Sequence, residues 1–334
     1  MRRLIAAIFT VGLAWTMGSG DAAAQRTLRI NESLGPGSVE EAALNEFKRL
    51  VEAGSQGQLQ IRIFLNDSLG NAQTSLENLM TGTLDLYSGA MEYYQPIVPT
   101  EIGVMSVPYL LRDHAHMRRY LASPAFETAR SKLLERGVRF LSTEFNADRG
   151  PYRVFISTRP VNSLADLNGL RIRMFPNEIA INAWRHLGTV PTVLPHTETY
   201  LALRQGVVQG APYPIAGILP SRFAEVARYV LRTNEFPQTW PITISERVWR
   251  ALPEPQRQLL VASANQAGRR YAQETHARVA RDIETMRRDN NAVFTEIDLE
   301  PFRRHMQSYH QELVRNGAIS RELYDAIVAL GAGS

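Results

Sequence analysis

The stretch "GLRIRMFPN", residues 169–177, has the alternation of a buried β-strand that carries charge on one face. Successive side chains of a strand point to opposite faces. One face is apolar and consists of Leu170, Ile172 and Met174. The other consists of Arg171, Arg173 and Phe175. A guanidinium keeps its charge when it is buried, and burial without an anionic partner is very costly. The stretch therefore raises the question of which anion Arg173 meets.

The segments on both sides of this strand alternate between strand and helix patterns. A strand is expected over 151–157, and a short helix over 162–170, with Ser163 and Asp166 as its capping box and Gly169 as its end. The segments after the strand are, in order, a helix that stops at Gly188, a strand over 189–195, a helix over 197–206 and a strand over 207–214.

The N-terminal part of the chain has the same pattern. Strands are expected over 26–31, 58–65 and 84–90, with a helix capped by Ser38 and Glu41 and a second helix over 72–81 between them. This β-α-β-α-β order is typical of a parallel sheet covered by helices. The chain is therefore predicted to contain two similar α/β units joined across roughly 145–151.

Residues 255–290 read as one long helix of about 50 Å, longer than one small domain. Such a helix could lie along both domains; the alternative is two helices that break near Gly268. We expect one domain to comprise 25–149 plus about 237–280. The second comprises 150–236 plus about 281–330.

The first residues have the pattern of an export signal. Arg2 and Arg3 precede an apolar stretch too short to span a bilayer, and small residues follow it. We expect cleavage of residues 1–24 after Ala24 and hence a periplasmic protein; the alternative is an uncleaved anchor. No other apolar run approaches the ~20 residues of a membrane helix.

The composition excludes several classes of protein. The net charge is only +4, and basic and acidic residues are interleaved, which argues against a nucleic-acid partner. The absence of cysteine excludes a disulfide scaffold and thiolate metal sites. Lysine occurs only at Lys48 and Lys132, so almost every cation is an arginine, and the residue type alone does not mark Arg173 as a ligand contact.

Signatures of catalysis and of metal binding are missing from the sequence. There is no Walker loop, no G-x-S-x-G elbow and no H-E-x-x-H motif. The spacings of the pair His114 and His116, and of the pair His305 and His310, which is expected on a surface helix, suit no shared metal ion. We therefore expect no catalytic residue, no metal and no cofactor.

Five segments in this order resemble the dicarboxylate-binding family of substrate-binding proteins from tripartite ATP-independent periplasmic (TRAP) transporters. They are 57–86, 104–121, 159–177 ("RPVNSLADLNGLRIRMFPN"), 187–214 and 242–267. The resemblance implies a two-domain α/β fold of the periplasmic-binding-protein type (type II-like), with a ligand cleft between the domains. It also implies capture of an organic acid for delivery to a membrane permease that uses an ion gradient.

The resemblance implies an answer for Arg173, since the family's arginine at this strand position grips the ligand carboxylate in a bidentate pair. Arg153 matches a second pocket arginine, whereas Arg171 is expected at the surface. Residues expected to line the pocket are Tyr213, Phe175, Ala90, His196, Glu235 and Tyr94, and Tyr93 is a further aromatic candidate.

Several positions depart from the family's patterns. Pro212 and Tyr213 replace a Glu-Trp pair that holds a metal in relatives binding keto acids. Ala90 replaces a glutamate of relatives that bind sialic acid, and Glu235 lies near a frequent histidine. The acid itself stays open between a dicarboxylate, a sugar acid, a keto acid and an aromatic acid. Two other functions also stay open, a periplasmic enzyme that acts on an organic acid and a binding protein that serves a sensor kinase.

Overall fold

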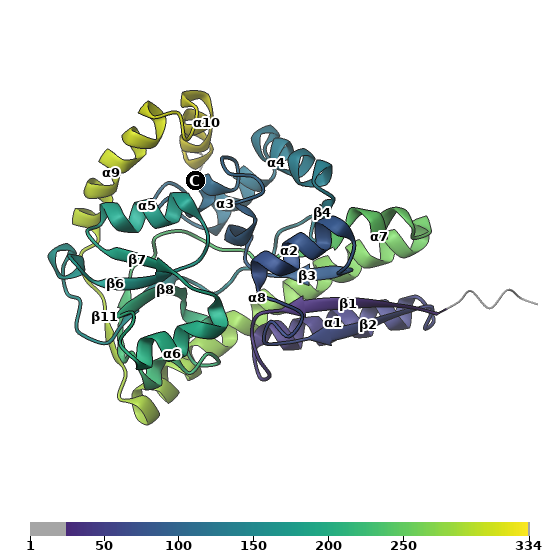
Figure 1. Ribbon diagram of the computed structural model, residues 1–334, viewed down its shortest axis with the longest axis horizontal. Coiled ribbons are helices and arrows are strands. Elements are labelled where there is room, and N and C mark those ends of the chain that lie inside the picture. The colour runs from purple at the N-terminus through teal and green to yellow at the C-terminus, as the bar shows by residue number, and fades with distance from the viewer. Residues whose placement is uncertain (1–24, 333–334) are drawn as a thin grey trace, which may run out of the picture.

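Two mixed β-sheets organise the chain into two α/β lobes, as the computed structural model shows for residues 25–332 (Figure 1). The first sheet has the order β2-β1-β3-β10-β4 and the second has the order β11-β9-β5-β8-β6-β7. The predicted two-domain α/β fold class is confirmed. The predicted signal peptide, residues 1–24, lies outside the described residues.

The strands of the first sheet are β1 (Arg26–Glu32), β2 (Leu59–Phe64), β3 (Leu86–Ser88), β4 (Val138–Phe140) and β10 (Ile242–Ser245). Those of the second are β5 (Arg153–Ser157), β6 (Arg171–Met174), β7 (Val190–Val193), β8 (Gly210–Pro214), β9 (Tyr229–Arg232) and β11 (Val293–Thr295).

The predicted β-α-β-α-β unit of the first lobe is confirmed, because β1 pairs in parallel with both β2 and β3. Helix α1 (Val39–Gly54) begins where the Ser38 hydroxyl accepts the Glu41 N–H at 3.1 Å, and the Glu41 carboxylate accepts the Gly37 N–H at 2.7 Å. Helix α2 (Ala72–Thr81) ends at Gly82, whose φ of 77° is left-handed. Strand β10 joins antiparallel after the chain has crossed the second lobe and returned, so the sheet is mixed.

The second lobe contains the opening stretch as strand β6, which lies between β7 and β8 in parallel. Asn177 caps the following helix α5 (Glu178–His186) through its side-chain oxygen. The helix expected over 162–170 is instead a 3-10 turn over Leu164–Leu167. The Asp166 carboxylate there accepts the Ser163 hydroxyl and the Asn162 N–H, so the two side chains close a turn rather than cap an α-helix.

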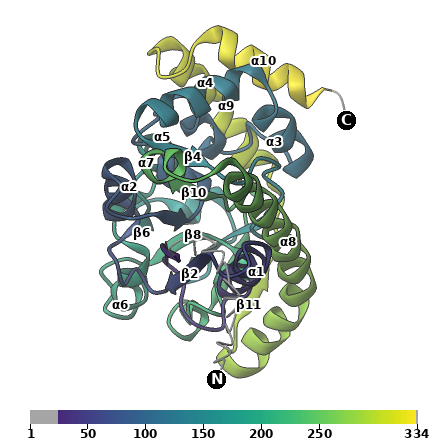
Figure 2. The ribbon, with the colours of Figure 1, turned by 90° about the vertical axis from the view of Figure 1, so that its right-hand side faces the viewer.

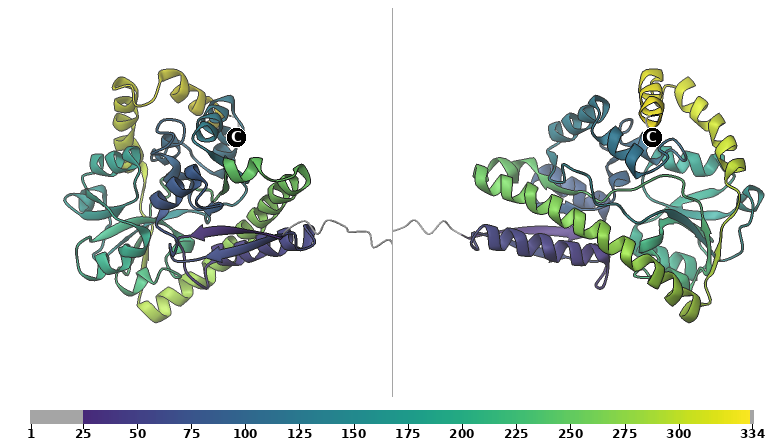
Figure 3. Two further views of the ribbon diagram at one scale, coloured as in Figure 1. Left: turned by 45° about the vertical axis from the view of Figure 1, so that its right-hand side comes forward. Right: turned by 180° about the vertical axis from the view of Figure 1, so that it is seen from behind.

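A single unbroken helix, α8 (Glu254–Asn290), runs across the back of both lobes, as Figure 3 shows from behind. It packs against α1 of the first lobe (Figure 2) and against 3-10 turns of the second. The alternative break at Gly268 is wrong. Glycine at this position admits the connecting segment between the lobes, because a Cβ would come within 2.2 Å of the Asn146 side-chain oxygen.

The C-terminal helices lie over the junction of the lobes. Helix α9 (Glu300–Arg315) packs on α5, and α10 (Arg321–Gly331) packs on α3 (His114–Leu121) of the other lobe. His310 is buried in this junction rather than exposed, and its ring bonds to the Pro108 carbonyl at 2.9 Å. The predicted domain boundaries remain a prediction.

The remaining helices are α4 (Pro124–Glu135), α6 (Thr199–Arg204) and α7 (Glu246–Arg250). One apolar core lies between the first sheet, α1 and α8, and another lies between the second sheet and its own helices. A third core continues from one lobe into the other through α5 and α9. Within residues 25–332, no helix combines the length and the apolar character that a membrane span needs.

Candidate functional site

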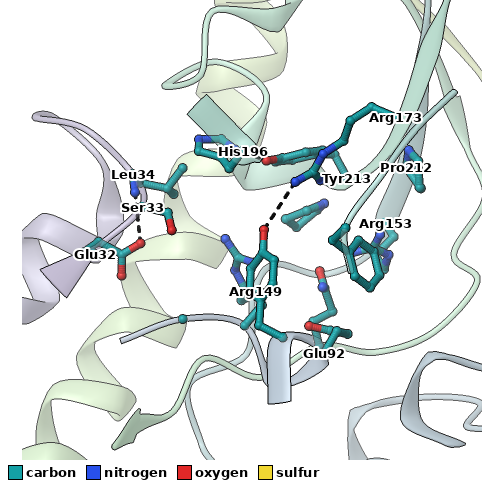
Figure 4. A pocket seen from close by; sticks show the side chains of 16 residues that line it. Glu32, Ser33, Leu34, Glu92, Arg149, Arg153, Arg173, His196, Pro212 and Tyr213 are labelled. Carbon is teal, nitrogen blue, oxygen red and sulfur yellow. Dashed lines mark hydrogen bonds between the residues drawn. The ribbon is translucent and has the colours of Figure 1, made fainter. Parts of the chain in front are cut away.

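A small polar cavity lies between the two lobes, beyond the carboxyl end of strand β6 (Figure 4). Its volume is about 30 Å³, room for roughly two water molecules. Residues from both lobes and from the segments that connect them line it: Glu32, Ser33, Leu34, Gly89, Ala90, Glu92, Tyr93, Arg149, Arg153, Arg173, Phe175, His196, Pro212, Tyr213, Pro214 and Gln238. Most of its charged side chains are buried, so charges and dipoles of both lobes meet there with little exposure to bulk water.

Arg173 reaches this cavity from β6 and is only 2% exposed. Its Nε donates to the Leu194 carbonyl at 3.0 Å, and its Nη2 makes a long contact of 3.5 Å to the Tyr93 hydroxyl of the other lobe (Figure 4). Among residues 25–332, no carboxylate oxygen lies within 4 Å of its nitrogens; Asp67 acts on it only through space. Arg173 thus places a positive charge inside the protein without a carboxylate of the described residues in direct contact.

Arg171 shows why position along the strand matters. It precedes Arg173 on the same face, yet it is exposed, and it donates to the carbonyls of Val207 and Gly206 at 3.1 and 2.9 Å. The difference arises because ligand crevices of such sheets lie beyond the carboxyl ends of their strands. The expectation that Arg171 is a surface residue is confirmed.

Arg153 lies at the start of β5 and already has its own counter-ion. Its Nε donates to the Glu235 carboxylate at 2.7 Å, and its guanidinium carbon lies 4.4 Å from the Phe236 ring centre. The same carboxylate also accepts the Thr233 hydroxyl. Only Nη2 of Arg153 is buried without a partner. The protein therefore supplies a counter-ion for Arg153. A role of Arg153 in binding the ligand carboxylate remains a prediction.

Arg149, which the sequence analysis missed, lies in the segment that connects the lobes. Its Nη2 contacts the Glu40 carboxylate at 3.3 Å, and the Tyr271 hydroxyl donates to the same oxygen at 2.9 Å. Its Nε is buried without a partner. No periodic pattern indicates the direction of a loop residue, so the only available signal is its closeness to Arg153 in the sequence.

Two buried carboxylates of the first lobe also line the cavity. Glu32 accepts the Leu34 N–H at 3.0 Å, the Ser88 hydroxyl at 2.7 Å and the Trp240 indole N–H at 2.9 Å. Burial, followed by repulsion from Glu40, raises the pKa of Glu32 to about 7.

Glu92 comes from the 3-10 turn Met91–Tyr94 and is 3% exposed. Burial raises the pKa of its carboxyl as well, and its Oε2 has no hydrogen-bond partner. In the view of Figure 4, it lies with Arg149 on the side of the cavity opposite Arg173. Neither Glu32 nor Glu92 has a sequence signal that separates it from an ordinary helix or strand terminus.

His196 and Tyr213 pack beside Arg173 (Figure 4) and are hydrogen-bonded to each other. Burial, together with the nearby charges of Arg173 and Arg149, lowers the pKa of His196 to about 3. The imidazole is therefore neutral at pH 7 and adds no second cation next to Arg173. The Tyr213 ring centre lies 5.8 Å from the Arg173 guanidinium carbon.

The family model of bacterial extracellular solute-binding protein, family 7 (DctP), matches residues 30–316. The chain belongs to this family. It is 27% identical over 308 residues to the sialic acid-binding periplasmic protein SiaP of Vibrio cholerae, and this match covers 92% of this chain and 94% of SiaP. A DctP-family chain is a solute-binding protein, and the two-lobed fold agrees with that assignment.

Solved structures support the same relationship. A TRAP periplasmic solute-binding protein from Ochrobacterium anthropi with bound L-fuconate is 25% identical, with a TM-score of 0.84 over 92% of this chain and 99% of that chain. Another, from Polaromonas sp. JS666 and bound to D-erythronate, is also 25% identical. Its TM-score is 0.81, and the match covers 91% of this chain and 98% of that chain. The fold of this DctP-family chain is thus that of TRAP solute-binding proteins.

The structure brings most of the predicted pocket residues of this DctP-family protein together. Those that line the cavity are Arg173, Arg153, Tyr213, Phe175, Ala90 and His196, with Tyr93 in addition.

Glu235 and Tyr94 do not line it. Glu235 lies behind Arg153, where it serves as the counter-ion. Tyr94 points into the first lobe, and its hydroxyl pairs with Thr243 at 2.9 Å, because successive residues of a 3-10 turn point in different directions.

Potential metal ligands are sparse around the cavity. Across the part of the chain that the structure describes, no three His, Cys, Asp or Glu side chains gather in a group that could hold a metal ion. Pro212 and Tyr213 lie at the cavity wall, and neither side chain offers a carboxylate to a metal ion. The polar groups that line this cavity are arginines, carboxyls, hydroxyls, an imidazole and an amide.

Proposed function

We propose that this chain captures an organic acid in the cavity, holds the carboxylate on Arg173 and delivers the acid to a TRAP-type membrane permease. The supporting observation is that Arg173 is buried and has no carboxylate partner among the described residues. A guanidinium fork matches a carboxylate in a bidentate pair, which a lysine ammonium does not. The acid completes the ion pair that the protein leaves open.

Lobe closure couples binding to the loss of water. Several hydrogen bonds cross between the lobes near the cavity: Arg173 to Tyr93, Asn177 to Ser106 at 3.0 Å, and the Glu178 N–H to Gln95 at 3.2 Å. A cavity of about 30 Å³ cannot admit an acid of several carbons without opening. The acid therefore enters when the lobes separate. Closure then strengthens its ion pair by excluding water.

The named ligands of the relatives agree with a carboxylate. Sialic acid, L-fuconate and D-erythronate each carry one. Ala90 occupies the position of a glutamate in sialic-acid binders, so we do not assign sialic acid to this chain. The relatives' periplasmic location and the signal-like residues 1–24 support export of this chain to the periplasm.

We assign the chain a binding role rather than a catalytic one. The raised pKa values of Glu32 and Glu92 are features that a catalytic base can have. The Glu32 carboxylate, however, already accepts three hydrogen bonds from the protein. Mass spectrometry of a bound acid should find it unchanged after long incubation. Turnover of that acid would establish an enzyme instead.

A thermal-shift screen of residues 25–334 against carboxylic acids tests the proposed function. A true ligand at 100-fold over its Kd stabilises the protein by about 2.7 kcal/mol. The same acid should give no shift with Arg173→Met and an unchanged shift with Arg171→Met. If no acid stabilises the protein, or if the shift persists in Arg173→Met, the proposal is wrong. Transport by proteoliposomes that contain the permease then tests delivery.

A further inference from the structure

We propose that the closed cavity takes up one proton together with the acid, and that the Glu92 carboxyl holds this proton. This inference rests on the proposed function, because it needs the carboxylate of the acid on Arg173. It adds a link between capture and pH, and it assigns the residue through which pH acts. It applies to any carboxylic acid that the cavity accepts.

Carboxyl groups outnumber guanidinium groups around the cavity. The three guanidinium groups that line it belong to Arg149, Arg153 and Arg173. The five carboxyl groups that line it or act on these cations belong to Glu32, Glu92, Glu40, Glu235 and Asp67. With every group ionised, the cluster has two more negative charges than positive ones before an acid enters.

The surplus negative charge lies on Glu32 and Glu92. Each of the other three carboxyls accompanies one arginine, two of them in direct contact and Asp67 through space. Among residues 25–332, no cationic nitrogen is in hydrogen-bond contact with Glu32 or Glu92. Glu32 has its three hydrogen bonds instead, whereas Oε2 of Glu92 is buried without a partner. Glu92 is therefore the carboxylate of this cavity whose charge the protein compensates least.

The acid adds a further negative charge to this enclosed cluster. Glu92 is 3% exposed and Arg173 is 2% exposed, so bulk water screens little of the repulsion between Glu92 and a carboxylate held on Arg173. A proton on Glu92 removes that repulsion and turns the carboxyl into a hydrogen-bond donor. An acceptor without a partner, the Gln238 side-chain oxygen, lines the same cavity.

The electrostatic surroundings of Glu92 give the direction of the pH dependence. Burial raises the pKa of its carboxyl, although Arg153 and Arg149 act in the opposite direction. A bound carboxylate raises this pKa further because it adds negative charge. Between the pKa values of the empty and the loaded protein, one proton therefore enters with each acid, and Kd rises with pH by up to about 10-fold per pH unit.

The other titratable groups at the cavity are less suited to hold this proton. Burial and the nearby arginines lower the pKa of His196 to about 3. Burial raises the pKa of the Tyr213 hydroxyl, which keeps the proton that it already has. Asp67 is only half-buried and does not line the cavity. Burial raises the pKa of Glu32 to about 7, but three donors already stabilise its charged form.

Calorimetry in buffers of different ionisation enthalpy counts the protons that accompany binding. The probes are D-erythronate, L-fuconate and the tightest other acid of the thermal-shift screen, each at pH 6, 7, 8 and 9. The wild-type protein should take up a fraction of a proton that approaches one at some pH of this range, and Kd should rise with pH there. Uptake below about 0.2 proton at all four pH values, together with a constant Kd, overturns the proposal.

The variant Glu92→Gln tests the assigned residue, because glutamine has the shape of a protonated glutamate and does not titrate. It should bind the acid without proton uptake and with the same Kd from pH 6 to 9, and at pH 9 about 10-fold or more tightly than wild type. A purely structural role of Glu92 would instead weaken binding at every pH. Asp282→Asn, which changes a buried carboxyl of α8 outside the cavity, should keep the wild-type uptake and profile.

Glu32→Gln distinguishes the two surplus carboxyls and should retain the uptake. Loss of the uptake in Glu32→Gln but not in Glu92→Gln would show that the assignment to Glu92 is wrong. If an acid binds without a proton and Arg173→Met abolishes its binding, the proposed function holds and the proton linkage is wrong. If no acid of the screen binds, the proposed function fails and the linkage fails with it.

Discussion

Replacement of Arg173 by methionine should weaken ligand binding and leave the empty protein at least as stable as before. Both effects come from the positive charge of Arg173: it attracts the ligand carboxylate, but it is costly to bury when no ligand is bound. In the closed form that the structure describes, the Arg173 guanidinium is buried and has only the Leu194 carbonyl and the distant Tyr93 hydroxyl as hydrogen-bond partners. A buried charge with so few partners costs stability, and methionine replaces it with a shorter, flexible and uncharged side chain that lacks that cost.

The magnitudes follow from burial and from the missing counter-ion. Removing one partner of a desolvated ion pair costs about 2–5 kcal/mol of binding, or roughly 30-fold to several thousand-fold in Kd. Replacing the buried cation with an apolar side chain should change the free energy of unfolding of the empty protein by between zero and about +2 kcal/mol. Loss of the hydrogen bond to Leu194 is the main opposing effect.

Calorimetry and urea unfolding of the same preparations measure both quantities. Arg171→Met is the matched control, since it removes an exposed arginine two residues earlier on the same strand. That control should keep the wild-type Kd. The reasoning is refuted if Arg173→Met binds the acid normally, or if it destabilises the empty protein by several kcal/mol, because the charge would then already be satisfied by the protein.

Two further predictions concern the buried carboxylates. Arg153→Met leaves Glu235 buried without its cation and should lower the free energy of unfolding, measured in urea, by about 3–5 kcal/mol. The double variant Arg153→Met with Glu235→Leu should recover most of that loss. Equal losses in the single and the double variant would contradict the pairing. The pKa of Glu32 is about 7 in the folded protein and near 4.3 in the unfolded chain, so the folded state binds the proton more tightly. The free energy of unfolding should therefore fall by roughly 3 kcal/mol as the pH rises from 4.5 to 8. Glu32→Gln should flatten that profile and exposed Glu77→Gln should not; a steep profile in Glu32→Gln would exclude this carboxyl as its source.

Local sequence patterns predicted the parts of the fold that local forces decide. Apolar alternation located β2 and β6, the Ser38 cap located the start of α1, and the sustained helical spacing located α8. Strand alternation also placed Arg171 and Arg173 on one face. Alternation could not predict that Arg173 is buried and Arg171 is exposed, since burial depends on which end of the sheet carries the cleft.

Long-range pairing is what the sequence alone could not supply. Glu235 is 82 residues from Arg153 and becomes its counter-ion only because the segment after β9 returns beside β5. Glu40 reaches Arg149 across 109 residues. The same limit applies to the sheets, where the antiparallel strand β10 arrives from the far side of the second lobe. Residues with ordinary local patterns therefore acquire their roles only when the lobes meet.

A crystal structure of residues 25–334 with an acid identified by the screen tests the central claim most directly. The account predicts a closed form in which both carboxylate oxygens of the acid lie within about 3 Å of the Arg173 guanidinium. A carboxylate bound elsewhere, or Arg173 paired with a carboxylate of the protein itself while the acid is bound, would contradict it.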